Sequence, residues 1–154
     1  MRAVLQRVRH ASVTADGVYA GACNHGLLVL LGVSRGDTVL DAVHLADKIS
    51  KVRIFSDENG KMNRALPDVS GEVLVVSNFT LCAAYAKGNR PDYFAAEEPV
   101  AAKALYEEFV RLMRERVGRV ETGVFGADMQ ISVALDGPVT IVMDSDVLRK
   151  GEKS

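Results

Sequence analysis

The chain has 154 residues, of which 48% are hydrophobic and 25% are charged, and its formal net charge is -1. This length is typical of one domain with its own core, and no apolar run approaches the roughly 20 residues that a membrane-spanning helix needs. This charge argues against a protein that wraps a long nucleic-acid backbone, because such proteins carry a strongly basic surface. Binding to one end of an RNA remains compatible with this charge.

Strands are predicted by alternating or continuous runs of β-branched and apolar residues. They cover residues 2–9, 11–15, 18–22, 26–33, 53–56, 61–63, 73–76, 120–124, 129–135 and 139–143. The first two are separated at Arg9–His10. Asp16–Gly17 predicts a tight hairpin turn, and Asn59–Gly60 predicts the type I′ turn of a second hairpin. The runs 26–33 and 73–76 lack polar alternation, so we place both inside the sheet.

Two helices are predicted between these strands. The first starts at a cap formed by Asp37 or Thr38, and its apolar residues recur at helical spacing to form one stripe. The second has Pro99 in its first turn and ends at Gly118. Both helices carry one apolar face, and we expect them to pack on the sheet.

Strands outnumber helices, and several connections are hairpins. The expected fold class is therefore α/β, with mostly antiparallel sheets and helices packed on sheet faces. Residues 1–148 are expected to form a single domain, and residues 149–154 a polar, frayed C-terminal tail.

The N-terminal stretch contains Arg2 and Arg7 and lacks the apolar segment of a signal peptide, which predicts a cytoplasmic protein. The only cysteines, Cys23 and Cys82, are far apart and have no His or Cys at metal-ligand spacing. We therefore expect reduced, partly buried thiols, no metal and no cofactor. Cys82 is a candidate nucleophile, but no neighbouring basic residue favours its thiolate.

The stretch Glu72–Leu81 is the candidate centre of a site, because its apolar run ends in Ser77, Asn78 and Thr80. Polar groups at strand ends are often binding groups on a rigid scaffold. Capping of the strand by the same side chains is the alternative. A second stretch contains Gly137–Pro138 between two apolar runs, which normally indicates a turn. A cis bond there would hold both flanking carbonyls in a rigid, outward-pointing arrangement.

These two stretches resemble motifs of the D-aminoacyl-tRNA deacylase family. Ser77-Asn78-Phe79-Thr80-Leu81 is similar to the family's Ser-Gln-Phe-Thr-Leu, and Gly137-Pro138-Val139-Thr140 is similar to its Gly-cisPro motif. The resemblance extends, in order and at family spacing, over roughly residues 1–145. It includes Met1–Val4, Gln6–Val8, Gly26–Val29, Ala46–Ile49, Gly60–Asn63 and Phe125–Met129.

The resemblance implies a layered fold and an enzyme that hydrolyses the ester of D-aminoacyl-tRNA, and of glycine mischarged on tRNA, as chiral proofreading in translation. The implied partners are the 3′ end of aminoacyl-tRNA and a second copy of the chain, with no membrane and no DNA. In such a homodimer, Gly137 and Pro138 reach the site of the other subunit as a chiral selector. The implied catalytic residues are Ser77, Phe79 and Thr80. The implied substrate-binding residues are Asn78, Phe125 and Met129, and core packing is the alternative for the last two. Arg7 is expected to hold the Gly-Pro turn, with an ordinary surface or sheet-edge arginine as the alternative. Lys87 and Gly88 are added as substrate-binding candidates because they lie in the loop directly after the motif.

Ser77 and Thr80 have no base close to them in sequence, so we favour positioning and oxyanion stabilisation over covalent catalysis. Backbone N–H groups near Phe79 and Thr80 are the expected donors. The resemblance implies that the terminal 2′-hydroxyl of the substrate takes part in the reaction.

Basic residues form two local clusters, one at Lys87 and Arg90 and one at Arg111, Arg114, Arg116 and Arg119. Lys87 and Arg90, in the polar loop 83–91, are the better candidates for contact with RNA. The arginines between residues 111 and 119 are interpreted as solvated helix surface.

Two positions depart from the family pattern. Asn78 stands where the family has Gln, and Leu135 stands where it typically has Asn. Leu135 continues the apolar face of Ile131 and Val133 and is expected to be buried with it. These departures keep two alternatives open. One is a relative of shifted specificity that removes small L- or achiral amino acids from tRNA, and the other is a non-catalytic dimeric module that binds RNA ends.

Overall fold

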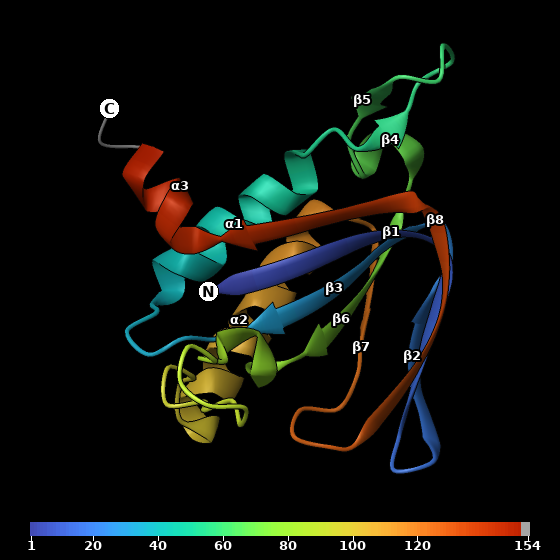
Figure 1. The fold of residues 1–154 in the computed structure, drawn as a ribbon. Coiled ribbons are helices and arrows are strands. Elements are labelled where there is room, and N and C mark those ends of the chain that lie inside the picture. Colours follow the sequence, from blue (N-terminus) through green and yellow to red (C-terminus); the bar gives the residue numbers. More distant parts are fainter. Residues whose placement is uncertain (152–154) are drawn as a thin grey trace.

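The computed structural model describes residues 1–151, which form a six-stranded sheet, a two-stranded sheet and three α-helices (Figure 1). The strands are β1 (Arg2–Ala15), β2 (Val18–Cys23), β3 (Gly26–Gly32), β4 (Phe55–Ser56), β5 (Met62–Arg64), β6 (Glu72–Ser77), β7 (Arg119–Thr122) and β8 (Met129–Asp144). The helices are α1 (Val39–Lys51), α2 (Pro99–Arg116) and α3 (Ser145–Gly151), and the 3₁₀ turns are η1 (Pro67–Val69) and η2 (Phe79–Cys82).

The large sheet is mixed rather than mostly antiparallel. Its strand order is β2-β1-β3-β6-β7, and β8 pairs with β1. β1 runs antiparallel to β2, β3 and β8, whereas β3, β6 and β7 run parallel. The prediction of mostly antiparallel pairing is therefore only partly right. Helices α1 and α2 carry the chain back between β3, β6 and β7, and such helical crossovers produce parallel neighbours.

β1 and β8 are each one long strand, whereas the sequence predicts two strands for each. Arg9–His10 does not break β1, because the irregularity is taken up in the pairing with β8 instead. Gln6 pairs with Thr140 but Val8 pairs with Leu135, so residues 136–139 bulge out of β8. Such a bulge bends the strand locally without ending it.

The main core lies between the sheet and the helices. In Figure 1, α1 and α2 cover one face of the sheet and α3 lies beside α1. The cap position at Thr38 is confirmed. Asp41 Oδ2 accepts the Thr38 N–H at 2.8 Å, and the Asp41 N–H donates to Thr38 O at 3.0 Å at the start of α1. The prediction that both helices pack on the sheet is also confirmed. The core includes Leu27, Leu31, Leu45, Ile49, Val73, Val75, Phe109 and Met113, all fully buried.

The two predicted hairpin turns have different geometries. Asp16 and Gly17 both have positive φ, 48° and 80°, which confirms the tight turn between β1 and β2. In the β4–β5 hairpin only Gly60 has positive φ, so the predicted type I′ turn is wrong. Asp57 accounts for the difference, because its carboxylate accepts the N–H groups of Asn59 and Lys61 and favours another turn type.

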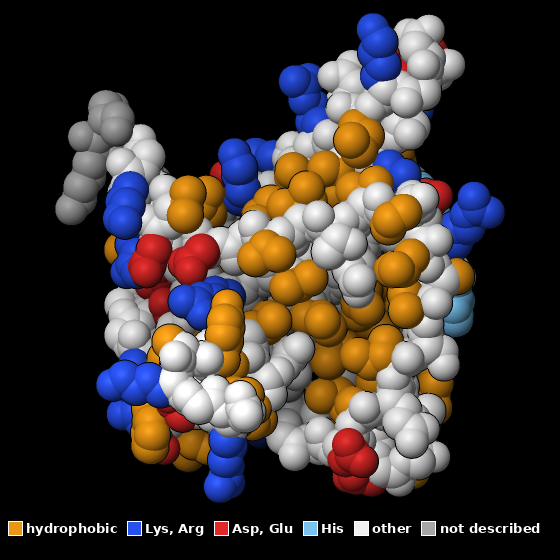
Figure 2. Space-filling model, in the orientation of Figure 1, with side chains coloured by type: hydrophobic (Ala, Val, Ile, Leu, Met, Phe, Trp, Pro, Cys, Tyr) orange, Lys and Arg blue, Asp and Glu red, His pale blue; other side chains and the backbone are white. Residues whose placement is uncertain are grey.

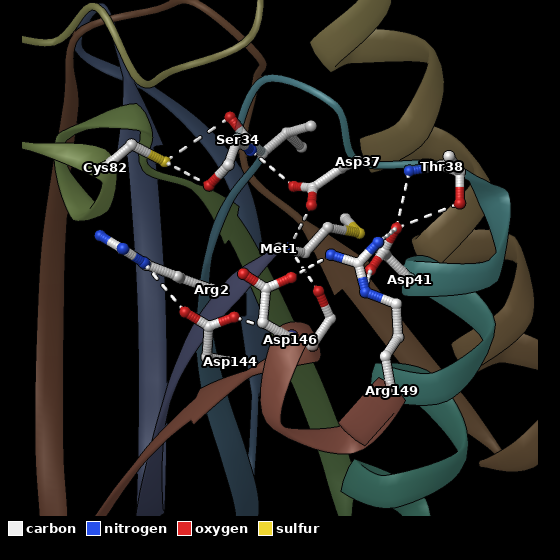
Figure 3. Close-up of polar contacts among 12 residues, drawn as sticks. Met1, Arg2, Ser34, Asp37, Thr38, Asp41, Cys82, Asp144, Asp146 and Arg149 are labelled. Atoms are coloured by element: carbon white, nitrogen blue, oxygen red, sulfur yellow. Dashed lines mark hydrogen bonds and ion pairs between the residues drawn. The ribbon is translucent and has the colours of Figure 1, made fainter. Parts of the chain in front are cut away.

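The N-terminus is anchored between α1 and α3 (Figure 3). The Met1 ammonium donates to Asp37 Oδ1 and to Ser145 Oγ, both at 2.6 Å. Arg149 in α3 forms an ion pair with the buried Asp41 at 3.2 Å. Residues 149–151 are therefore helical rather than frayed as predicted, and residues 152–154 of the predicted tail lie outside the described residues.

The sheet is nearly closed, because β7 approaches β2 through side chains. Glu121 of β7 accepts the Ala22 N–H of β2 at 2.7 Å, and Glu72 of the neighbouring β6 accepts the N–H of Asn24, just after β2, at 2.7 Å. Arg119 lies between the two carboxylates and pairs with both. Hydrogen bonds to side-chain carboxylates thus take the place of backbone–backbone hydrogen bonds at the edge where β7 approaches β2.

This closure is expected to weaken in acid. Arg119 and the Ala22 N–H hold the pKa of Glu121 below its usual range, and the Asn24 N–H does the same for Glu72. A lowered pKa in the folded state stabilises the fold above the ordinary glutamate pKa of about 4.3, and this contribution disappears as the pH falls further. We expect urea unfolding midpoints to drop between about pH 5 and pH 3. Glu121→Gln should make that dependence shallower, and the exposed Glu107→Gln should leave it unchanged. Parallel curves for all three proteins would contradict this account.

Candidate functional site

The Ser77–Leu81 motif lies where β6 ends against β3. Val73–Val76 are buried, as predicted, and Ser77 is the last strand residue. Asn78 extends the pairing by donating its N–H to Leu31 O at 2.8 Å, and the chain then turns into η2. The motif is thereby fixed to the centre of the sheet.

Two backbone donors in this turn are unoccupied. Within residues 1–151, the N–H groups of Phe79 and Thr80 make no hydrogen bond, as is usual for the first N–H groups of a helical turn. The Thr80 hydroxyl donates to Asn78 Oδ1 at 2.5 Å. Two adjacent N–H donors at a cavity wall can hold a developing oxyanion.

The motif forms one wall of a cavity of about 450 Å³. Hydrophobic side chains gather over the middle of the face shown in Figure 2, in front of β3 and β6. The cavity is lined by six of the predicted site residues, namely Ser77, Asn78, Phe79, Thr80, Phe125 and Met129. Residues that are about 47 positions apart in sequence (78 and 125) therefore share one site.

Sequence reasoning missed several residues of this cavity, including Tyr106 and Glu97. The Tyr106 hydroxyl donates to Val75 O at 3.0 Å, and its ring lies 5.6 Å from that of Phe125. Burial raises the pKa of Tyr106, so it stays a neutral donor. Helical periodicity assigns Tyr106 to a core-facing stripe, and nothing local in the sequence distinguishes a cavity wall from a core.

Lys87, Gly88 and Cys82 do not line the cavity. Lys87 and Gly88 are exposed in the loop that follows η2. The thiol of Cys82 is buried, 3.3 Å from Ser34 Oγ and 3.6 Å from Val33 O, so it is not placed as a nucleophile. Burial raises the pKa of the other thiol, Cys23, to about 11.

Gly137 and Pro138 lie in the bulge of β8, and the bond between them is cis. Arg7 holds the residue before them. Its Nε donates to Asp136 O at 3.1 Å and lies 3.2 Å from Asp136 Oδ2, while Nη1 donates to Ile54 O at 2.7 Å.

This bulge is far from the Ser77–Leu81 motif of the same chain. Arg7 pairs with Leu27, and Leu27 pairs with Val73. Val73 precedes Ser77 by four residues, which is roughly 13 Å along a strand. The two motifs are therefore separated by several strands and by roughly 13 Å along the strand direction.

Leu135 is not buried as predicted. It is 44% exposed, and Ile131 and Val133 on the same strand are 36% and 42% exposed. β8 pairs with β1 along one edge only, and no element of residues 1–151 covers this strip. β8 therefore presents an open apolar strip.

Arg111 and Arg114 are exposed on α2, as predicted, whereas Arg116 is partly buried and the exposed Arg119 lies on β7 rather than on a helix. Arg111 pairs with Glu108 and Glu115, and Arg119 pairs with Glu72 and Glu121. Within residues 1–151, no three His, Cys, Asp or Glu side chains gather as metal ligands would, and no helix has the length and hydropathy to cross a bilayer.

Comparison with known proteins agrees with this geometry. Residues 4–144 match the profile of the family described as D-Tyr-tRNA(Tyr) deacylase. A D-aminoacyl-tRNA deacylase of Anaeromyxobacter dehalogenans is 57% identical over 94% of this chain and 97% of the relative, and one of Thermus aquaticus is 53% identical over 94% and 95%. A solved structure of c-Myc DNA Unwinding Element Binding Protein is 40% identical, with a TM-score of 0.88 over 94% of this chain and 98% of the other. The chain therefore belongs to the D-Tyr-tRNA(Tyr) deacylase family.

Proposed function

We propose that this enzyme hydrolyses the ester bond of D-aminoacyl-tRNA in the cytoplasm and releases free tRNA and the D-amino acid. The observation that carries the proposal is the pair of unoccupied N–H donors at Phe79 and Thr80, on the wall of a cavity large enough for a nucleoside. Attack on an ester carbonyl places negative charge on its oxygen, and preorganised donors stabilise that charge. The names of the relatives agree with this chemistry.

The attacking group is a water or the terminal 2′-hydroxyl of the tRNA rather than a protein hydroxyl. Thr80 donates its proton to the amide oxygen of Asn78, which is not a base and does not activate a nucleophile. Phe125, Met129 and Tyr106 form the apolar wall against which the terminal adenosine rests. Catalysis then depends on position and on the two N–H donors.

Thr80→Ala is expected to keep the single-turnover rate within about threefold of the wild-type rate, because the backbone donors remain and only a positioning hydroxyl is lost. Rates with D-Tyr-tRNA check this directly. Ser77→Ala serves as the companion variant for the other hydroxyl of the motif. Trapping of an acyl group on Thr80 would contradict the mechanism.

Selection of the D form is assigned to Gly137 and Pro138 of a second copy, placed against the cavity of the first. The distance between the two motifs in one chain supports this arrangement, and so does the exposed apolar strip of β8, which a homodimer would cover. A backbone wall fixed by Arg7 excludes an L side chain by position and reads no side-chain identity. The enzyme should then accept many D-amino acids and glycine.

The deciding experiment is single-turnover deacylation of D-Tyr-tRNA, L-Tyr-tRNA and Gly-tRNA by EDTA-treated protein. Cleavage of the D ester with the L ester spared supports the proposal. Equal cleavage of D and L esters would identify a relative of shifted specificity, for which Asn78 and Leu135 are the positions to examine. Binding of a non-hydrolysable aminoacyl-adenosine without any cleavage would identify a non-catalytic module.

A further inference from the structure

A loop beside the cavity carries an unusual set of exposed side chains. Ala84 and Asp92 exchange two backbone hydrogen bonds of 2.9 Å, which close residues 85–91 into a loop directly after η2. The next residue, Tyr93, packs edge-on against Phe79 with ring centroids 5.1 Å apart. Phe79 itself lines the cavity, so the loop begins at the cavity wall.

Two aromatic rings of this segment are almost fully exposed. Tyr85 is 79% exposed and Phe94 is 80% exposed. A ring gains little from folding when it stays in water, because its apolar area is not removed from the solvent. Phe79 and Tyr93 are also exposed, at 58% and 40%, so four exposed aromatic residues lie between residues 79 and 94, and one of them lines the cavity.

The same loop carries two uncompensated cations. Lys87 and Arg90 are exposed, and neither forms an ion pair within residues 1–151. This contrasts with Arg111 and Arg119, whose charges are each neutralised by two carboxylates. The loop therefore offers free positive charge in a chain whose formal net charge is -1.

Exposed aromatic rings interleaved with free cations are the features by which proteins hold single-stranded nucleic acid, with bases stacked on rings and phosphates near cations. We propose that Tyr85 and Phe94 stack on the unpaired nucleotides that precede the terminal adenosine of the tRNA, and that Lys87 and Arg90 contact their phosphates. This inference rests on the proposed function, which places that adenosine in the cavity beside Phe79. The loop then gives the enzyme its preference for tRNA over a smaller ester.

Two substrates separate this role from catalysis. D-Tyr-tRNA has the unpaired nucleotides, whereas the D-Tyr ester of adenosine carries the same bond and the same nucleoside without them. We expect Tyr85→Ala and Phe94→Ala each to lower kcat/KM for the tRNA about 5- to 150-fold, the range that corresponds to loss of one stacked base. Cleavage of the adenosine ester should stay unchanged. Tyr85→Phe, which keeps the ring, should restore activity on the tRNA.

The phosphate contacts proposed for Lys87 and Arg90 are tested separately, through the salt dependence of kcat/KM. Lys87→Ala and Arg90→Ala should each reduce the slope of log(kcat/KM) against log[salt] for the tRNA by about 0.7, the value for one phosphate contact to a single strand. Met62→Ala is the matched control for the aromatic variants, because Met62 is 56% exposed on β5 and lies outside this loop. Met62→Ala should change the rate of cleavage of neither substrate.

The outcomes are distinguishable. If the loop variants lower the rates on both substrates equally, or on neither, the loop does not hold the nucleotides. If sedimentation shows that Tyr85→Ala or Phe94→Ala dissociates a dimer, the surface is a contact between copies and the inference is overturned. If the wild-type protein cleaves neither ester, the proposed function itself has failed. Cleavage of both esters with unaffected loop variants overturns this inference alone.

Discussion

Replacement of Phe79 by proline is expected to lower the single-turnover rate on D-aminoacyl-tRNA about 10²- to 10³-fold, the usual effect of losing one oxyanion donor. Proline lacks an N–H, and its fixed φ suits the first position of a helical turn, so η2 should persist. The preceding Asn78 has φ -148° and ψ 86°. Its φ lies in the range that a residue before proline adopts, and its ψ needs to rise by roughly 35° to reach that range. Rates at saturating enzyme, with thermal unfolding measured in parallel, check the prediction.

Phe79→Ala is the matched control, because it removes the ring and keeps the N–H. It should weaken tRNA binding, since the ring lines the cavity and contacts Tyr93, but it should leave the saturating rate within about threefold of wild type. Equal loss in the proline and alanine variants would show that the ring, and not the donor, carries the effect. A proline variant with wild-type activity would remove Phe79 N–H from the mechanism.

Arg7→Ala is expected to destabilise the protein by about 3 kcal/mol, because a mostly buried guanidinium is lost and its partners stay behind. The Arg7 side chain is 11% exposed. It donates hydrogen bonds to Asp136 O and Ile54 O and forms an ion pair with Asp136 Oδ2. The bulge that carries Gly137 and Pro138 then loses its anchor. If the loss of this anchor reduces the free-energy discrimination between D- and L-Tyr-tRNA by about 1.4 to 2.8 kcal/mol, the ratio of D to L cleavage falls about 10- to 100-fold. Urea unfolding and paired single-turnover rates measure both effects.

Arg9→Ala controls for charge, because Arg9 lies 3.7 Å from Asp136 Oδ1 but its side chain is 78% exposed. An exposed ion pair of this kind contributes at most about 1 kcal/mol, and the D-to-L ratio should not change. Identical behaviour of the two variants would mean that net charge near Asp136 matters and the anchor does not. Loss of stability in Arg7→Ala with an unchanged ratio would separate Arg7 from chiral selection.

Local signals in the sequence predicted the elements that depend on local chemistry. The buried run 73–76, the cap at Thr38 and the turn at Asp16–Gly17 follow from hydrophobicity, hydrogen-bonding capacity and allowed φ angles. The unbroken β1 and the parallel β3–β6–β7 arrangement depend on which strands meet, and no short segment encodes that. Pairing across the molecule therefore overrides the local interruption at Arg9–His10.

The candidate site shows the same difference between features that local sequence predicts and features that depend on the whole fold. The family resemblance directed attention to Phe125 and Met129, and the structure brings both to the cavity beside Thr80. The sequence did not identify Tyr106 as a cavity residue, because an aromatic residue on an amphipathic helix has the same pattern whether it faces a core or a cavity. Lys87 and Gly88 do not line the cavity, and the position of their loop relative to it depends on the whole fold.

The pairing of β1 with β8 also determines when the protein can fold. These strands stand almost at opposite ends of the chain, and twelve residue pairs join them. Contacts of such long sequence separation slow folding, and a nascent chain cannot make them until its last strand leaves the ribosome. Until then β1 exposes an unpaired edge of fourteen residues, open to other strands. Synthesis that stops before β8 should therefore yield an aggregation-prone fragment rather than a partly active enzyme.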